Sequence, residues 1–207
     1  MTVYRCYVEK RPEYAVEAQG VHATLNTVIL DGKIKGIRVF NRYDLEDIEE
    51  ADYRKASEMI LSEPQVDTLF HENAPAPADD EWVLAVEYLP GQFDQRADSA
   101  AQCIQLMTCK TRPEVRTARL YYIQGDLSEE EKQKIRETLI NPVEAREAAL
   151  EKPETIRMQY EVPPLPEVLD GFVEKDPEEL SSLRSLLGLA MDLADLVFLQ
   201  SYFREEE

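Results

Sequence analysis

The pattern of hydrophobic and polar residues changes its period twice in the first part of the chain. Residues 4–9 alternate between apolar and polar side chains, as in a strand that buries one face. Apolar residues then recur at the spacing of one helix face: Val21, Leu25 and Val28. The alternation returns over residues 34–41, which predicts a second strand, and residues 41–45 are predicted to form a turn.

A second helix and a short strand complete this first unit. Apolar residues at helical spacing indicate the helix: Tyr53, Ala56 and Ile60. Residues 66–70 form a short apolar run, which is typical of a closing strand. Residues 73–80 are rich in Pro, Ala and Asp and have no periodicity, so we expect a connector there.

The same order of elements is predicted after the connector. Residues 82–88 alternate as in a strand, and one helix face follows: Ala100, Cys103, Ile104 and Met107. Residues 115–123 predict the next strand. Ser128 and Glu131 have the spacing of a capping box, in which each side chain accepts a hydrogen bond from the other residue's backbone N–H. A helix should therefore begin at Ser128.

Short sequence matches connect the two units. Pro12 matches Pro90 and Tyr14 matches Phe93, within two longer segments that both leave a strand, turn and open a helix. Further matches pair residues 37–40 with 118–122, 44–45 with 126–127, and 63–66 with 141–143. The sequence therefore predicts one duplicated unit of roughly 80 residues, which is too long for a solenoid repeat.

Each predicted unit would cover one face of a sheet with helices, which leaves strand edges and the other face exposed. Two tandem units can remove this exposure by pairing with each other. We therefore expect an α+β fold with helices packed on antiparallel sheet, in which two β-α-β-α-β units form an intramolecular pseudo-dimer.

The last part of the chain has a different character. Residues 163–166 are rich in proline, as in an extended connector, while Asp176, Pro177 and Glu179 are the signals of a helix start. A leucine stripe then predicts a helical region. We divide the chain into a first repeat (1–72), a connector (73–80), a second repeat (81–148), an extended connector (149–175) and a helical linker domain (176–207).

Charge and composition narrow the class of partner. The chain has 207 residues and a formal net charge of -19, which argues against nucleic acid because phosphate contacts need clustered Lys and Arg. No apolar run is long enough to span a bilayer, so we expect no membrane partner. The chain begins directly with a strand and without a leader pattern, so a cytoplasmic location is expected.

Three cysteines without a CxxC pair argue against both a disulfide framework and a zinc site. We expect reduced and mostly buried thiols, with Cys6 and Cys103 in the core. The acidic run over residues 46–52 lacks the oxygen spacing of a calcium loop, and we expect a solvated helix start.

No local motif indicates a catalytic, cofactor or metal site. The two histidines, His22 and His71, lie far apart without an acid or thiol beside them, and no glycine-rich phosphate loop is present. A polar cluster at the second unit's first helix start, residues 92–99, can in principle hold an anion through free N–H groups. Asp94 and Asp98 oppose this, so helix capping and an inter-domain contact are favoured.

Five segments of the chain resemble one enzyme family: Val3–Gly20, Ser62–Asp67, Leu89–Cys103, Ile140–Glu147 and Gly188–Phe203. They are similar to the start of bacterial large-type phosphoribosylformylglycinamidine synthase. The resemblance covers essentially the whole chain, and Leu89–Cys103 is its most specific part. In that family the first region resembles a fused dimer of a small accessory subunit, and a helical linker domain follows.

The resemblance implies a place in purine biosynthesis. Enzymes of the family are ATP-dependent carbon–nitrogen ligases with glutamine amidotransferase activity, and they convert formylglycinamide ribonucleotide to formylglycinamidine ribonucleotide. ATP and Mg²⁺ are expected for the whole enzyme and no cofactor for this part, since no catalytic residue of the family maps onto this chain. The implied role is an inactive scaffold that packs against the synthetase and glutaminase domains.

The inter-domain contact is expected at Gln92, Phe93, Asp94, Gln95 and Arg96. Apolar surface left by absent domains would also permit self-association. Two alternatives stay open: a stand-alone interaction or regulatory module, and a small enzyme that uses Arg96 with Asp94 or Asp98.

Overall fold

The structure is a computed structural model that describes residues 2–28, 32–157 and 168–205. It divides the chain into two compact units, a sheet unit (Met1–Gln159) and a helical unit (Tyr160–Glu207). The predicted proline-rich connector at residues 163–166 lies outside the described residues. Each unit is described by itself.

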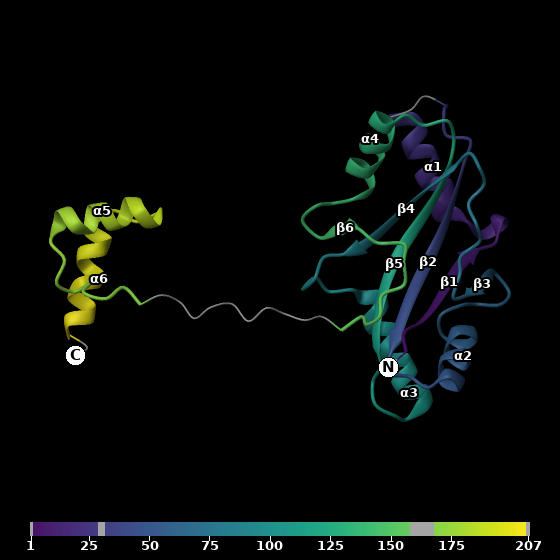
Figure 1. The fold of residues 1–207 in the computed structure, drawn as a ribbon, viewed down its shortest axis with the longest axis horizontal. Coiled ribbons are helices and arrows are strands. Elements are labelled where there is room, and N and C mark those ends of the chain that lie inside the picture. The colour runs from purple at the N-terminus through teal and green to yellow at the C-terminus, as the bar shows by residue number, and fades with distance from the viewer. Residues whose placement is uncertain (1, 29–31, 158–167, 206–207) are drawn as a thin grey trace. The chain divides into compact units, whose positions relative to one another are not determined.

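The sheet unit is built on one antiparallel sheet of six strands (Figure 1), in the order β3-β1-β2-β5-β4-β6. Its strands are β1 (Tyr4–Lys10), β2 (Gly36–Glu46), β3 (Asp67–His71), β4 (Glu81–Tyr88), β5 (Glu114–Gln124) and β6 (Ala145–Glu147). The two longest strands, β2 and β5, pair along their whole length in the middle of the sheet. The expectation of an α+β fold with antiparallel sheet is confirmed.

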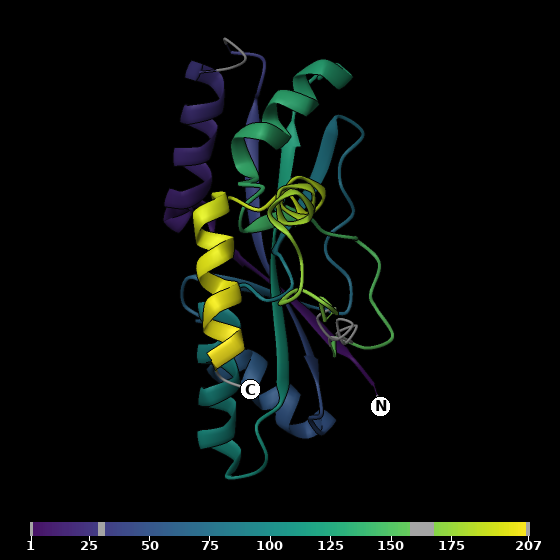
Figure 2. The same ribbon diagram turned by 90° about the vertical axis from the view of Figure 1, so that its left-hand side faces the viewer.

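The helices of this unit pack on one face of the sheet. They are the 3-10 turn η1 (Pro12–Tyr14) and the helices α1 (Val16–Val28), α2 (Glu50–Met59), α3 (Gln95–Thr108) and α4 (Glu129–Leu139). Figure 1 shows α1 and α4 at one end of the sheet and α2 and α3 at the other. In Figure 2, α1 and α3 follow one another along the same side of the long strands.

Two apolar clusters hold these helices to the sheet. In the first, Leu25 of α1 and Ile135 of α4 pack against Val39 and Ile123 of the central strands. In the second, residues of α2 and α3 pack against β1 and β2: Tyr53, Ala56, Ala100, Ile104, Cys6, Val8, Tyr43 and Leu45. Alternate residues of each strand thus supply the helix-covered face, as a period of two requires.

The opposite face is covered by extended chain. Phe40 and Tyr122 lie in a third apolar cluster on this face, against which Ala74 and Ala148 pack. The hydroxyl of Tyr122 donates to the carbonyl oxygen of Pro75 at 3.0 Å. The segments before β4 and after β6 therefore close the face that a helix layer would otherwise have to cover.

The predicted turn over residues 41–45 is wrong, because these residues continue β2 to Glu46. Asn41 pairs with Val8 of β1 on one side and with Arg119 of β5 on the other. Pairing on both edges holds polar residues in an extended conformation that their turn propensity disfavours. The match of residues 44–45 with 126–127 is wrong as well, since 126–127 follow the end of β5.

The helical unit contains α5 (Pro177–Leu187) and α6 (Leu193–Glu205), whose buried residues Leu180 and Leu196 anchor it. Asp176 caps α5 in a capping box with Glu179, as the start signals predict. Gly188 ends α5 in the left-handed region, with φ of 61°. Within the described residues, no helix combines the length and apolar character needed to cross a bilayer.

The capping box at Ser128 is confirmed, and Lys33, from the residues before β2, binds Glu131 there. The hydrogen bond from Lys33, followed by that from the Ser128 backbone, lowers the pKa of Glu131 to about 2. A carboxyl with a pKa lowered by folding stabilises the protein above its unfolded pKa of 4.5, and this contribution is lost as the pH falls toward 2.

We therefore expect Glu131→Gln to reduce the acid sensitivity of the fold. Thermal unfolding between about pH 5 and pH 2 should show a smaller fall in Tm for this variant than for the wild-type chain. Glu130→Gln is the matched control, because Glu130 forms an exposed pair with Lys134 on the same helix. Parallel curves for wild type and Glu131→Gln would contradict the expectation.

Candidate functional site

The segment predicted to make an inter-domain contact joins β4 to α3, and its aspartate has a structural role. Asp94 is the N-cap of α3, and its Oδ1 accepts from the backbone N–H of Ala97 at 2.9 Å. Its Oδ2 accepts from the hydroxyl and the backbone N–H of Thr117, at 2.7 and 3.2 Å. Asp94 thereby fastens the helix start to β5, and the predicted helix capping is confirmed.

The neighbouring residues point outward. Phe93 is 70% exposed and Gln95 is exposed, while Gln92 Nε2 donates to the carbonyl oxygen of Val143 at 3.3 Å. Val143 is itself 75% exposed. Two apolar side chains from distant parts of the sequence thus stand in solvent beside one turn, which is the kind of surface that partner proteins cover.

A groove of about 450 Å³ lies beside the start of α3, and we name it the α3 groove. Its lining residues are Tyr43, Ile60, Leu61, Tyr88, Gln95, Arg96, Ser99, Ala100, Cys103 and Arg119. The guanidinium of Arg96 donates to the Tyr43 hydroxyl at 3.3 Å. Arg119 Nε lies 3.2 Å from Oε1 of Glu17 on α1. The structure therefore brings Arg96 together with a second arginine that sequence reasoning did not connect with it.

The prediction that Cys103 lies in the core is wrong, and its thiol is exposed at this groove. Ala100 and Ile104 form the buried stripe of α3, and Cys103 lies at the edge of that stripe. Cys109 is exposed too, so of the three thiols only Cys6 is buried. Burial, followed by the negative charge of Asp44, raises the pKa of the Cys6 thiol to about 12.

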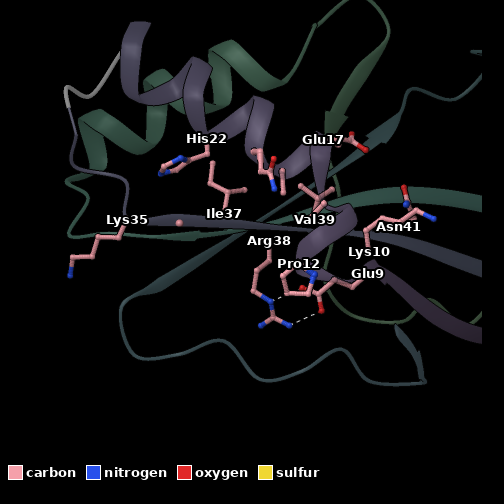
Figure 3. A pocket seen from close by; sticks show the side chains of 14 residues that line it. Glu9, Lys10, Pro12, Glu17, His22, Lys35, Ile37, Arg38, Val39 and Asn41 are labelled. Carbon is pink, nitrogen blue, oxygen red and sulfur yellow. Dashed lines mark hydrogen bonds and ion pairs between the residues drawn. The ribbon is translucent and has the colours of Figure 1, made fainter. Parts of the chain in front are cut away.

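A second pocket, of about 350 Å³, lies between α1 and β2 (Figure 3). In Figure 3, His22 reaches down from α1 and Ile37 and Val39 lie on β2 beneath it. Arg38 points away from α1 in Figure 3 and forms a two-pronged ion pair with Glu9, at 2.7 and 2.8 Å, where its guanidinium lies over the ring of Phe40. Ala18, Ile37 and Val39 give the pocket an apolar interior, and the Arg38 guanidinium does not point into it.

Both histidines have structural partners. His22 Nε2 lies 2.8 Å from the carbonyl oxygen of Ile34. His71 Nδ1 lies 2.9 Å from the hydroxyl of Tyr53, which donates to the carbonyl oxygen of Arg5. Burial, with the charge of Arg54, lowers the pKa of His71. His71 is also the cross-strand partner of Cys6, but burial raises the pKa of that thiol, which disfavours a thiolate nucleophile.

The acidic run over residues 46–52 is only partly the solvated helix start that was predicted. Glu46 is buried at the end of β2, and its Oε2 accepts from the Thr155 hydroxyl and the Ile156 backbone N–H, at 2.7 and 2.9 Å. These hydrogen bonds lower the pKa of Glu46. Its role is to fix the extended segment after β6. No group of three or more metal-binding side chains occurs among the residues for which a placement is given.

A buried cluster of charges lies on the face opposite the helices, and sequence reasoning missed it. Arg5 binds Asp44 with both nitrogens of its fork, at 2.5 and 2.9 Å, and Arg42 lies 3.3 Å from the same carboxylate. Arg5 and Arg42 also donate to the carbonyl oxygens of Leu150 and Ala149. The sequence did contain a signal for this cluster. Arg42, Asp44 and Glu46 occupy every second position of β2, and residues two apart in a strand lie on the same face.

Comparison with protein-family models and with curated protein sequences gave no match. The proposed function therefore rests on the geometry of the sheet unit, on the α3 groove and on the exposed turn at Phe93.

Proposed function

We propose that this chain is a non-catalytic scaffold whose sheet unit is a duplicated β-α-β-α-β element paired as an intramolecular pseudo-dimer. The observation that supports this most is the strand register. In the first half, Tyr4 pairs with Leu45. In the second half, the residues 78 positions later, Trp82 and Ile123, pair with each other in the same way. The pair of Val8 with Leu69 likewise recurs 78 positions later as the pair of Val86 with Glu147.

The central pairing has the property that a two-fold axis requires. Asn41 pairs with Arg119, which is the residue 78 positions further along the chain. In an interface with two-fold symmetry, the same surface of each half faces its copy. The two-fold axis then passes between the two equivalent residues that pair with each other, here Asn41 and Arg119. The helices support the same offset, since α1 and α2 precede α3 and α4 by about one repeat length.

Apolar exposure supports a scaffold role. Phe93 and Val143 stand in solvent on the sheet unit, and Val168, Leu186 and Phe198 are at least 70% exposed on the helical unit. Exposed apolar side chains on both units indicate surfaces that bind other protein domains. This favours a chain that organises partners.

The partners we propose are the synthetase and glutaminase domains of a phosphoribosylformylglycinamidine synthase, in line with the resemblance of residues 89–103. ATP and Mg²⁺ would be bound by those domains. The scaffold would hold the glutaminase and synthetase active sites in a fixed relative position, so that ammonia released from glutamine reaches the amide acceptor without protonation in water.

The test compares two activities of the enzyme that contains this chain. Phe93→Ala and Gln95→Ala should lower glutamine-dependent turnover several-fold more than ammonia-dependent turnover, because only the first requires coupling between domains. Val16→Ala is the control, since Val16 is an equally exposed residue on α1. Equal losses in both activities, or none, would overturn the coupling role.

A further inference from the structure

We propose that the α3 groove is a binding site for an oxyanion, a phosphate or carboxylate group, held by the guanidinium groups of Arg96 and Arg119. The two arginines come from different elements, α3 and β5, and line one groove of about 450 Å³. A guanidinium presents a planar fork of N–H donors that matches the oxygens of carboxylate and phosphate. The groove can therefore hold a small molecule through its anionic group.

The donors of Arg96 are largely unused. Among the described residues its one hydrogen bond goes to the Tyr43 hydroxyl, and it has no ion pair. Asp94 and Glu17 act on Arg96 by charge but do not pair with it, and the Asp94 oxygens accept from Ala97 and Thr117. An arginine without a bound carboxylate keeps N–H donors for an incoming anion, even in a chain with 42 acidic and 23 basic residues.

The fold itself does not require these two cations. This step rests on the proposed repeat, in which positions 78 residues earlier are equivalent. The equivalents of Arg96 and Arg119 are Ala18 and Asn41, and the first half builds the same elements with them. The first half therefore forms these elements without an arginine at either position.

The first half has a pocket at the corresponding place, and its lining includes Ala18 and Asn41, so no arginine stands at either position there. The equivalent of Cys103 is Leu25, which is fully buried and packs in the first apolar cluster. At this position the first half has a buried leucine, whereas the second half has an exposed thiol beside the hydroxyls of Tyr43, Tyr88 and Ser99. These hydroxyls supply further donors for an anion.

Glu17 is the internal competitor for this site. Its carboxylate lies 3.2 Å from Arg119 Nε, and both side chains are about half exposed. An incoming anion must displace a surface carboxylate that is held only weakly. Removing the charge of Glu17 should therefore strengthen anion binding, a gain that a structural role of Arg119 would not produce.

The first test is calorimetric titration of the full chain with inorganic phosphate and, in a second arm, with succinate at matched ionic strength. Saturable binding of phosphate alone or of succinate alone shows whether the groove prefers a phosphate or a carboxylate group. Arg96→Gln and Arg119→Gln should each weaken it about tenfold, and Glu17→Gln should tighten it. Arg112→Gln is the control, because Arg112 pairs with Asp98 on the same helix outside the groove lining and should bind normally.

The second test uses the thiols as reporters. The anion should slow alkylation of Cys103 by iodoacetamide severalfold and leave Cys109 unchanged, as measured by peptide mass spectrometry, because Cys109 is exposed outside the groove lining. No saturable binding of either probe at millimolar concentration, or equal effects on both thiols, overturns the proposal. Neither readout depends on glutamine-coupled turnover, so this failure is distinct from failure of the scaffold role.

Discussion

Asp44→Ala is expected to destabilise the sheet unit by about 3–5 kcal/mol, because it leaves buried Arg5 without its counter-charge and Arg42 with only Glu87, at 3.7 Å. Arg5, Arg42 and Asp44 are each exposed by 4% or less. Arg5 loses two hydrogen bonds, of 2.5 and 2.9 Å, and Arg42 loses its closest carboxylate. Burial already lowers the pKa of Arg42, which reports the cost of holding its charge away from water.

Urea unfolding followed by circular dichroism measures this effect as a fall in the transition midpoint. Asp98→Ala is the control, since Asp98 forms an exposed pair with Arg112, and its removal should cost less than about 1 kcal/mol. Equal small losses for both variants would show that the buried cluster is hydrated and does not depend on Asp44.

Phe40→Ala should cost about 3–5 kcal/mol, because it empties the centre of the face that only extended chain covers. Phe40 is fully buried, and its ring lies 4.7 Å from that of Tyr122 and 6.1 Å from that of Phe70. The Arg38 guanidinium lies over the same ring at 4.9 Å. Segments without regular structure cannot readily collapse into the cavity, so the lost contacts are not replaced.

The matched control is Phe93→Ala, which removes the same side chain from a position that is 70% exposed. Its effect on the unfolding free energy should stay within about 0.5 kcal/mol. A loss for Phe40→Ala as small as that of Phe93→Ala would mean that this face of the sheet contributes little to the core.

Local sequence signals anticipated the elements well where one short segment decides the outcome. The alternation at residues 4–9 and 82–88 becomes β1 and β4, and the spacing of Ser128 and Glu131 becomes the capping box of α4. Period and capping depend on contacts within a few residues, so the sequence carries them directly.

The candidate site was anticipated only in part, because its residues meet through strand pairing. Asp94 as a cap follows from its position before a helix, but its contact with Thr117 and the approach of Arg96 to Arg119 depend on α3 lying on β5. The burial of Asp44 was not anticipated, because strand register is set by non-local pairing. The core position predicted for Cys103 was wrong, because the part of α3 that the sheet covers depends on tertiary packing.

By itself, the sequence determined most of the strands and helices, their order along the chain, and a strongly acidic composition. These follow from periodicity, capping and charge, which act between near neighbours. Only the tertiary structure decided that β2 and β5 meet in the middle of one sheet, that residues 41–45 continue a strand, and that Arg96 and Arg119 share a groove. The first two outcomes depend on backbone hydrogen bonds between residues about 80 positions apart, and the third depends on how α3 packs on β5, so no short segment holds both partners.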